Sequence, residues 1–304
     1  MLIADVERYV ALQRSLGLRF DEQARLLLCY ARFASAAGDG FVVTQRVRAW
    51  SSEATSPRQA RLRYDTARRF AAFLRAEDGR HEVPPSGAFG RGRRPRPAPY
   101  LLSPSEIAAI MTAALDVPPK GTISPLTYHH LFGLLAATGL RISEALALKR
   151  TDLTDDGLVV RRGKFAKSRL LPLHPSTRAA LDRYLVARQR LGAGGDDLFV
   201  VRHGRAPTKV RVYCVFVRLA RALGIRGVQG ARGPRLHDLR HSFAVRSLTA
   251  CPPDRTAVTR HMLALSTYMG HADVAATYWY LQATPVLLNG IAAAAEQAFA
   301  GGAA

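Results

Sequence analysis

The most informative stretch of the chain is Leu236-His237-Asp238-Leu239-Arg240-His241-Ser242-Phe243-Ala244. His237 and His241 stand four positions apart, so on a helix their side chains would share one face and could bind a metal ion. However, Arg240 would place a positive charge beside such an ion, and no clear third ligand follows in the sequence. The stretch therefore leaves a zinc site open as an alternative, but favours another use of these side chains.

Three further segments hold polar side chains among apolar ones. They read Ala137-Thr138-Gly139-Leu140-Arg141-Ile142-Ser143-Glu144-Ala145-Leu146, Gly163-Lys164-Phe165-Ala166-Lys167-Ser168-Arg169-Leu170-Leu171-Pro172-Leu173, and Met269-Gly270-His271-Ala272-Asp273 leading to Tyr278-Trp279-Tyr280. Taken alone, Arg141 would be a helix-surface charge, and Lys164 and Lys167 would decorate a turn. Taken alone, His271 and Tyr280 would be core residues, the usual place for such side chains. Only the combination of all four segments indicates a shared site.

Together, and in this order, the four segments resemble the tyrosine recombinase (phage integrase) family. ATGLRISEALAL at 137–148 looks like the family's first-arginine box, and HDLRHSFA at 237–244 looks like its His-x-x-Arg box. MGHADVAATYWY at 269–280 looks like the Gly-His box that leads to the nucleophile. The resemblance spans roughly residues 100–282. It implies a site-specific, integrase- or transposase-like recombinase in which a tyrosine attacks a DNA phosphate.

The resemblance implies roles for the two arginines and two of the histidines. Arg141 and Arg240 would donate hydrogen bonds to the phosphoryl oxygens, whose negative charge grows in the transition state. His237 and His271 would donate further hydrogen bonds to the phosphate or manage the tyrosine proton. Glu144 and Asp238 would cap helices or support these groups.

The family also supplies a proton for the leaving 5′ oxygen from a lysine in a β-hairpin turn. Lys164 fits that position in the motif, with Lys167 in reserve. The family's spacing from the Gly-His histidine selects Tyr280 as the nucleophile. Tyr278 lies about 200° away around a helix and should not enter the same site, and Tyr268 looks like a packing residue.

The reaction implied by the resemblance needs no cofactor. Attack by Tyr280 would give a 3′-phosphotyrosine linkage and a free 5′ hydroxyl. Because that covalent bond conserves the energy of the phosphodiester, religation requires neither ATP nor a metal. The family further implies a homotetramer on two double-stranded DNA sites, with partner recombinases as an option. The Ala-rich stretch 291–300 could pack on a neighbouring protomer or on its own domain.

The composition also points to a polyanionic partner. Among 304 residues, 44 are Lys or Arg and 23 are Asp or Glu, a formal net charge of +21. Like charges repel in a compact protein, and nucleic acid is the commonest polyanion that compensates them. An anionic membrane surface is the competing partner, but it would need a lipidation signal or a basic amphipathic helix suited to a membrane, and the sequence offers no convincing example of either. With no secretory signal and no disulfide or metal pattern among Cys29, Cys214 and Cys251, we expect a cytoplasmic protein.

A change of composition divides the chain. Residues 84–99 are rich in Pro, Gly and Arg and predict a basic linker between a helical DNA core-binding domain, 1–83, and a catalytic domain, 100–304, with a C-terminal helix. Residues 57–77 predict an amphipathic helix whose polar face carries many arginines and almost no acids. That face is either simply exposed to solvent or binds the phosphates of a nucleic acid. The arginines predicted to contact DNA are Arg58, Arg61, Arg68, Arg91, Arg93 and Arg94.

The expected fold is mainly α with a small β-sheet: a helical core-binding domain and a mixed α/β catalytic domain that together form a clamp around DNA. In the catalytic domain, Ser103 and Glu106 predict a helix start, and Gly139 predicts a helix end. Short strands are expected at 158–160 and 170–173, and helices at about 175–190, 209–223 and 239–248.

Three other functions compete with recombination. A type IB topoisomerase uses nearly the same catalytic set but relaxes supercoils as a monomer. A non-catalytic DNA-binding accessory protein would need no complete set of polar residues. A metal-dependent nuclease would need a cluster of carboxylates to hold its ion, which the sequence lacks.

Overall fold

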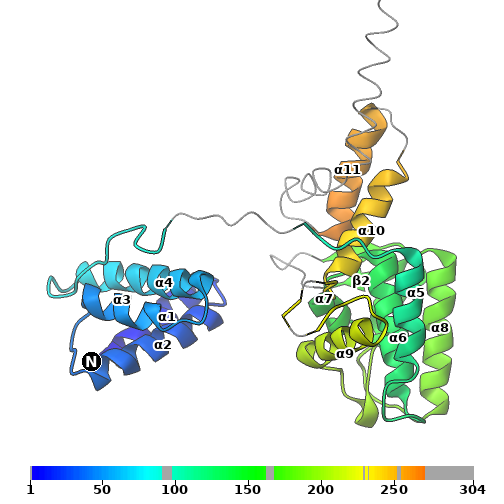
Figure 1. Cartoon of the computed structure of the whole chain (residues 1–304), viewed down its shortest axis with the longest axis horizontal. Coiled ribbons are helices and arrows are strands. Elements are labelled where there is room, and N and C mark those ends of the chain that lie inside the picture. The colour runs from blue at the N-terminus through cyan, green and yellow to red at the C-terminus, as the bar shows by residue number, and fades with distance from the viewer. Residues whose placement is uncertain are drawn as a thin grey trace, which may run out of the picture. The chain divides into compact units, whose positions relative to one another are not determined.

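The computed structural model describes residues 2–90, 98–161, 168–228, 230–231, 233–251 and 255–270. The chain forms two compact units, residues 1–96 and residues 97–304. Within the described ranges, helices dominate both units (Figure 1).

The described part of the N-terminal unit consists of the helices α1 (Leu2–Ser15), α2 (Asp21–Ala36), α3 (Thr44–Ser52) and α4 (Pro57–Arg75). Helix α4 starts where the Ser56 side chain accepts a hydrogen bond from the backbone N–H of Gln59, with Pro57 in the first turn. The amphipathic helix predicted at 57–77 is thus confirmed. The buried aromatic side chains of this unit's core are Tyr9, Tyr30, Trp50, Tyr64 and Phe70.

The first residues of the segment predicted as a linker pack on α4. The Tyr64 hydroxyl donates to the carbonyl of Pro85 at 2.9 Å, and Arg68 Nε donates to the carbonyl of Pro84 at 3.1 Å. The Phe89 ring lies 5.2 Å from the Tyr64 ring. Residues 84–90 therefore belong to the surface of the N-terminal unit, and residues 91–97 lie outside the described residues.

The C-terminal unit is built around α6 (Ile123–Thr138), which packs against α5, α8 and α10. Its other helices are α5 (Pro104–Ala114), α7 (Ile142–Ala147), α8 (Pro175–Arg190), α9 (Lys209–Ala222), α10 (Asp238–Thr249) and α11 (Arg255–Met269), with short 3-10 turns at Arg150–Asp152 and Arg202–Gly204. The helices predicted at 175–190, 209–223 and 239–248 correspond to α8, α9 and α10, so these predictions are confirmed.

The predicted helix signals act as expected. Ser103 Oγ accepts from the backbone N–H of Glu106 at 3.2 Å, and the Glu106 carboxylate accepts from the N–H of Ser103 at 2.7 Å. This reciprocal capping box starts α5. Gly139, with φ at 62°, ends α6.

One small antiparallel sheet is present in the described part of the C-terminal unit, in the order β1 (Leu153–Thr154), β2 (Gly157–Val160), β3 (Arg169–Leu171). Leu158 pairs with Leu171, and Val160 pairs with Arg169. The structure confirms the two predicted strands as β2 and β3 and adds the short β1. Residues 162–167, between β2 and β3, lie outside the described residues. The mainly helical architecture with a small sheet confirms the expected fold class.

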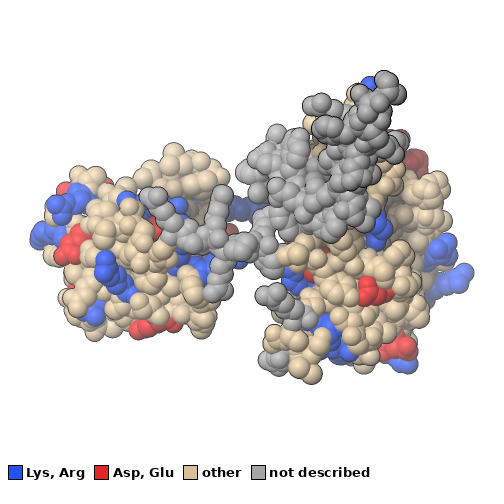
Figure 2. All heavy atoms as spheres, turned by 45° about the horizontal axis from the view of Figure 1, so that its top comes forward, with Lys and Arg blue, Asp and Glu red and all other residues tan. Residues whose placement is uncertain are grey.

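Basic side chains occur on the surface of both units, and fewer acidic side chains are interspersed among them (Figure 2). Among the helices that the structure describes, none has both the length and the apolar composition to cross a membrane.

Candidate active site

Gly139 brings the first two polar segments together. A Cβ at this position would lie 2.5 Å from Cδ1 of Phe243 on α10, closer than real Cβ contacts come, and its positive φ disfavours other residues as well. The absence of a side chain lets the end of α6 rest directly on the Phe243 ring. Arg141, which immediately precedes α7, is therefore placed beside the stretch 237–244.

Arg240 connects three of the four segments. Its side chain is buried on α10, with 3% of the residue exposed. Nη1 donates to the carbonyl of Gly139 at 2.6 Å, and Nη2 donates to the carbonyl of Met269 at 2.9 Å. The first-arginine segment, the His-x-x-Arg segment and the end of α11 thus meet at one guanidinium.

Arg141 also donates to the carbonyls at the end of α11. Its Nη2 donates to the carbonyl of Gly270 at 2.9 Å, and its Nη1 donates to Glu144 Oε1 at 2.8 Å. The Glu144 carboxylate also accepts from the backbone N–H of Arg141 at 3.0 Å, so Glu144 caps α7 as expected. Arg141 and Arg240, about 100 residues apart in sequence, therefore reach neighbouring carbonyls and lie together, as the family resemblance implied.

The buried Glu144 carboxylate is held by cations. Burial alone would raise the pKa of Glu144, but hydrogen bonds from Arg169 and from the Arg141 backbone outweigh it, so the pKa lies below its usual range. A charged carboxylate among arginines fixes their orientation, because each charge-assisted bond is short and directional.

Arg169 is the group in this cluster that the sequence interpretation missed. Its Nε donates to the carbonyl of Tyr268 at 2.9 Å, and Nη2 donates to Glu144 Oε2 at 3.0 Å. The signal available in the sequence was the two-residue period of a strand. Arg169 shares a side of β3 with the fully buried Leu171, and so points inward.

His237 stands just before α10, and its side chain faces the cavity described below. Although this side chain is accessible, the surrounding protein displaces much of the water that would solvate an imidazolium. That loss of water, and next the positive charge of Arg240, lower the pKa of His237 to about 4. The ring is therefore neutral at pH 7, and can both donate one hydrogen bond and accept another.

The alternative zinc site gains no support from the described ranges. His237 and His241 meet edge to face, with ring centroids 4.6 Å apart. No group of three His, Cys, Asp or Glu side chains in the described part of the chain is arranged to hold an ion. Asp238 instead accepts from the Arg235 backbone at 2.7 Å and from its guanidinium at 2.9 Å, which fixes the start of α10.

A cavity of about 600 Å³ lies beside His237 and Arg240. Lys209, Tyr213 and Arg235 also line it. The rest of its lining is mostly apolar, and Arg235 is paired with Asp238, so Lys209 and Arg240 are the basic side chains here that could meet an anionic group such as a phosphate.

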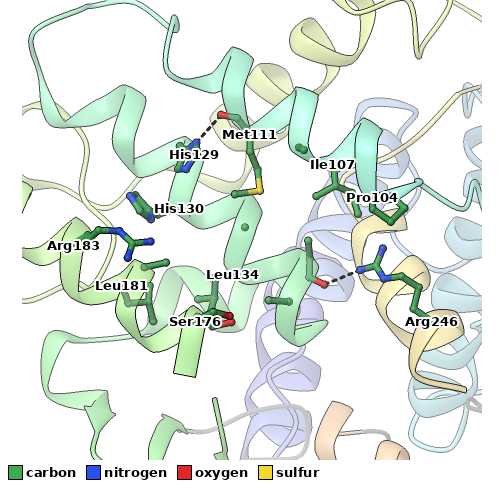
Figure 3. Close-up of a pocket in the computed structure, with 16 residues that line it drawn as sticks. Pro104, Ile107, Met111, His129, His130, Leu134, Ser176, Leu181, Arg183 and Arg246 are labelled. Carbon is green, nitrogen blue, oxygen red and sulfur yellow. Dashed lines mark hydrogen bonds between the residues drawn. The ribbon is translucent and has the colours of Figure 1, made fainter. Parts of the chain in front are cut away.

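A second cavity, of about 460 Å³, is formed by residues of α5, α6, α8 and α10 (Figure 3). It is mostly apolar, and its lining includes none of Arg141, His237 and Arg240. Arg246, at its edge, donates to the carbonyl of Ala136 at 3.1 Å. We assign this cavity no part in the chemistry.

The remaining predicted site residues fall in two groups. Lys164, Lys167, His271 and Tyr280, and the arginines Arg91, Arg93 and Arg94, lie outside the described residues. Of the other predicted DNA contacts, Arg58 is exposed on α4, Arg61 pairs with Asp65 at 3.4 Å, and Arg68 is held by Pro84. All of these roles stay predictions.

The chain is similar to known proteins along nearly all of its length. A family model described as the phage integrase family matches residues 101–285. The chain is 37% identical over 295 residues to a protein of Sinorhizobium fredii named as an integrase/recombinase, y4rB, covering 93% of each chain. It is 30% identical over 236 residues to the tyrosine recombinase XerD of Brucella suis, covering 76% of this chain and 73% of that protein.

Two solved structures show the same fold. One is the XerH site-specific recombinase bound to a palindromic difH substrate, with a TM-score of 0.64, 18% identity, and coverage of 92% of this chain and 80% of that chain. The other is a lambda integrase tetramer bound to a Holliday junction, with a TM-score of 0.64, 18% identity, and coverage of 91% and 76%.

Proposed function

Because the chain belongs to the phage integrase family, we propose that it is a site-specific DNA recombinase that cleaves and rejoins DNA through a 3′-phosphotyrosine formed by Tyr280. The observation that carries the proposal is the meeting of Arg141 and Arg240 at the carbonyls of Met269 and Gly270. The residue after Gly270 is His271, and the predicted nucleophile follows nine positions later.

In the proposed first step, the Tyr280 oxygen attacks phosphorus and the 5′ oxygen leaves. Arg141 and Arg240 stabilise the negative charge that develops on the non-bridging oxygens. His237 lines the same cavity as Arg240, and its ring can donate a hydrogen bond to the phosphate or help manage the tyrosine proton. Lys164 gives the leaving 5′ oxygen its proton.

In the second step, the 5′ hydroxyl of another strand attacks the phosphotyrosine. The phosphodiester re-forms, the tyrosine is released, and each group that gave or took a proton returns to its first state. One phosphoester bond is exchanged for another in each step, so the cycle needs neither ATP nor a metal.

We further propose a homotetramer on two double-stranded DNA sites, acting in the cytoplasm on a mobile element, with partner recombinases as an option. The solved lambda integrase, similar in fold, is a tetramer bound to a Holliday junction. A net charge of +21 suits an assembly that covers long stretches of phosphate. Arg58, Arg61, Arg68, Arg91, Arg93 and Arg94 are the proposed contacts of the N-terminal part with DNA.

The test uses the wild-type protein, Tyr280→Phe and Tyr278→Phe with DNA from either side of the protein's own gene. Wild type and Tyr278→Phe should form protein–DNA adducts that survive SDS, in the presence of EDTA, whereas Tyr280→Phe should bind DNA without forming one. Binding without any adduct would favour an accessory DNA-binding protein. Relaxation of supercoils without exchange between two sites would favour a topoisomerase.

A further inference from the structure

The end of α11 is held by a guanidinium that the mechanism above does not use. Arg169 starts β3, five positions after Lys164, and its side chain is 14% exposed. Its Nε donates to the carbonyl of Tyr268 at 2.9 Å, and its two terminal nitrogens reach the Glu144 carboxylate at 3.3 and 3.0 Å. One side chain thus joins the sheet, α7 and the last turn of α11.

The backbone of Gly270 lies so close to this guanidinium that a side chain at this position would collide with it. A Cβ at Gly270 would lie 2.7 Å from Nη1 and 2.9 Å from Cζ of Arg169. The φ of Gly270 is +66°, which also favours glycine. Arg169 therefore lies directly against the backbone from which the chain continues into His271.

Glu144 couples Arg169 to a catalytic arginine. Its Oε1 accepts from Nη1 of both Arg141 and Arg169, and its Oε2 accepts from the Arg141 backbone and from Nη2 of Arg169. Without Arg169, the negative charge of Glu144 would face Arg141 alone. The Arg141 guanidinium would then be drawn towards the carboxylate and be less able to turn towards a phosphate.

We infer that Arg169 is a positioning residue for DNA strand cleavage, which fixes the turn at Gly270 ahead of His271 and, through Glu144, the orientation of Arg141. The inference rests on the proposed function. The planar fork of arginine suits this role, because its three separate nitrogens reach a carbonyl and both oxygens of a carboxylate in fixed directions, whereas the donors of lysine all lie on one nitrogen.

The test compares Arg169→Ala and Arg169→Lys with wild type and with Arg178→Ala. Arg178 is the matched control, because it also binds a carbonyl, that of Thr154 at 2.7 Å, and a carboxylate, that of Asp182 at 3.1 Å, but on α8. For each protein we would measure the affinity for the target DNA, the single-turnover rate of adduct formation at saturating DNA, and the thermal midpoint of unfolding.

Arg169→Ala should lower the single-turnover rate about 10- to 100-fold while DNA affinity stays within about 3-fold of wild type. Arg169→Lys should recover part of the rate, and Arg178→Ala should cleave like wild type. The double variant Glu144→Gln, Arg169→Ala should lose less of its single-turnover rate than the product of the two single losses. Both substitutions act through the same contact between Arg169 and Glu144.

Three outcomes would overturn the inference. One is a wild-type cleavage rate in Arg169→Ala. Another is a loss of rate matched by an equal loss of DNA affinity. The third is a double variant whose loss of rate equals the product of the losses in Glu144→Gln and Arg169→Ala. If the wild-type protein itself forms no adduct, the proposed function fails, and this inference fails with it.

Discussion

At the scale of single residues, the candidate site is a cluster of positive charge held in place by protein carbonyls and one carboxylate. Arg141, Arg169 and Arg240 all donate to the last turn of α11, whose carbonyl end carries the negative pole of the helix dipole. These contacts orient the cationic groups in advance. Preorganised charge of this kind is what a phosphoryl-transfer transition state requires.

The neutral state of His237 gives a residue-scale prediction. Loss of solvating water and the charge of Arg240 both lower the pKa of His237, to about 4. Removing that charge in Arg240→Gln should therefore raise the pKa of His237, as followed by NMR titration of histidine ring signals in the DNA-free protein. If the titration midpoint of His237 is the same in both proteins, the electrostatic contact with Arg240 is not as described.

At the scale of secondary-structure elements, the junction of α6, α7 and α10 sets the site. Gly139 ends α6, turns the chain towards Arg141, and lets the backbone rest on Phe243. The sequence predicted the end of α6 from this glycine, because a positive φ favours glycine. It did not predict the contact with Phe243, because the packing of residues about 100 positions apart leaves no local pattern.

Gly139→Ala should lower the free energy of unfolding by about 1–3 kcal/mol. Gly121→Ala is the matched control, since Gly121 has a similar φ of +74° but nothing within 4 Å of an added Cβ. The free energy of unfolding of the control should fall only by the cost of the backbone strain. Equal losses for the two variants in urea unfolding would show that the contact with Phe243 adds nothing.

At the scale of the whole molecule, the sequence patterns predicted the helical architecture, and the family resemblance implied that two distant arginines share one site. Ordered polar motifs made the prediction of Arg141 and Arg240 possible, and capping residues such as Ser103 marked where helices begin. Arg169 was missed because its partners, the carbonyl of Tyr268 and the carboxylate of Glu144, are defined only by tertiary packing. The helix α11 was not among those predicted, because residues 251–265 carry none of the motifs that marked the other segments.

The excess of basic residues predicts strongly salt-dependent DNA binding. If Arg58 contacts a phosphate, Arg58→Ala should reduce the slope of log affinity against log salt concentration by about 0.9. Arg8→Ala is the control, because Arg8 is already paired with Asp5 and Glu77 within the N-terminal unit. An unchanged slope for Arg58→Ala would remove that residue from the DNA interface.

Mass spectrometry of the adduct would identify the residue that becomes bonded to DNA, for which we propose Tyr280. The adduct made by wild type would be digested with protease and nuclease, and the peptide that carries a nucleotide would be sequenced by fragmentation. We expect a nucleotide joined through its 3′ phosphate to Tyr280. A nucleotide on Tyr278 or on any other residue, or one joined through its 5′ phosphate, would contradict it.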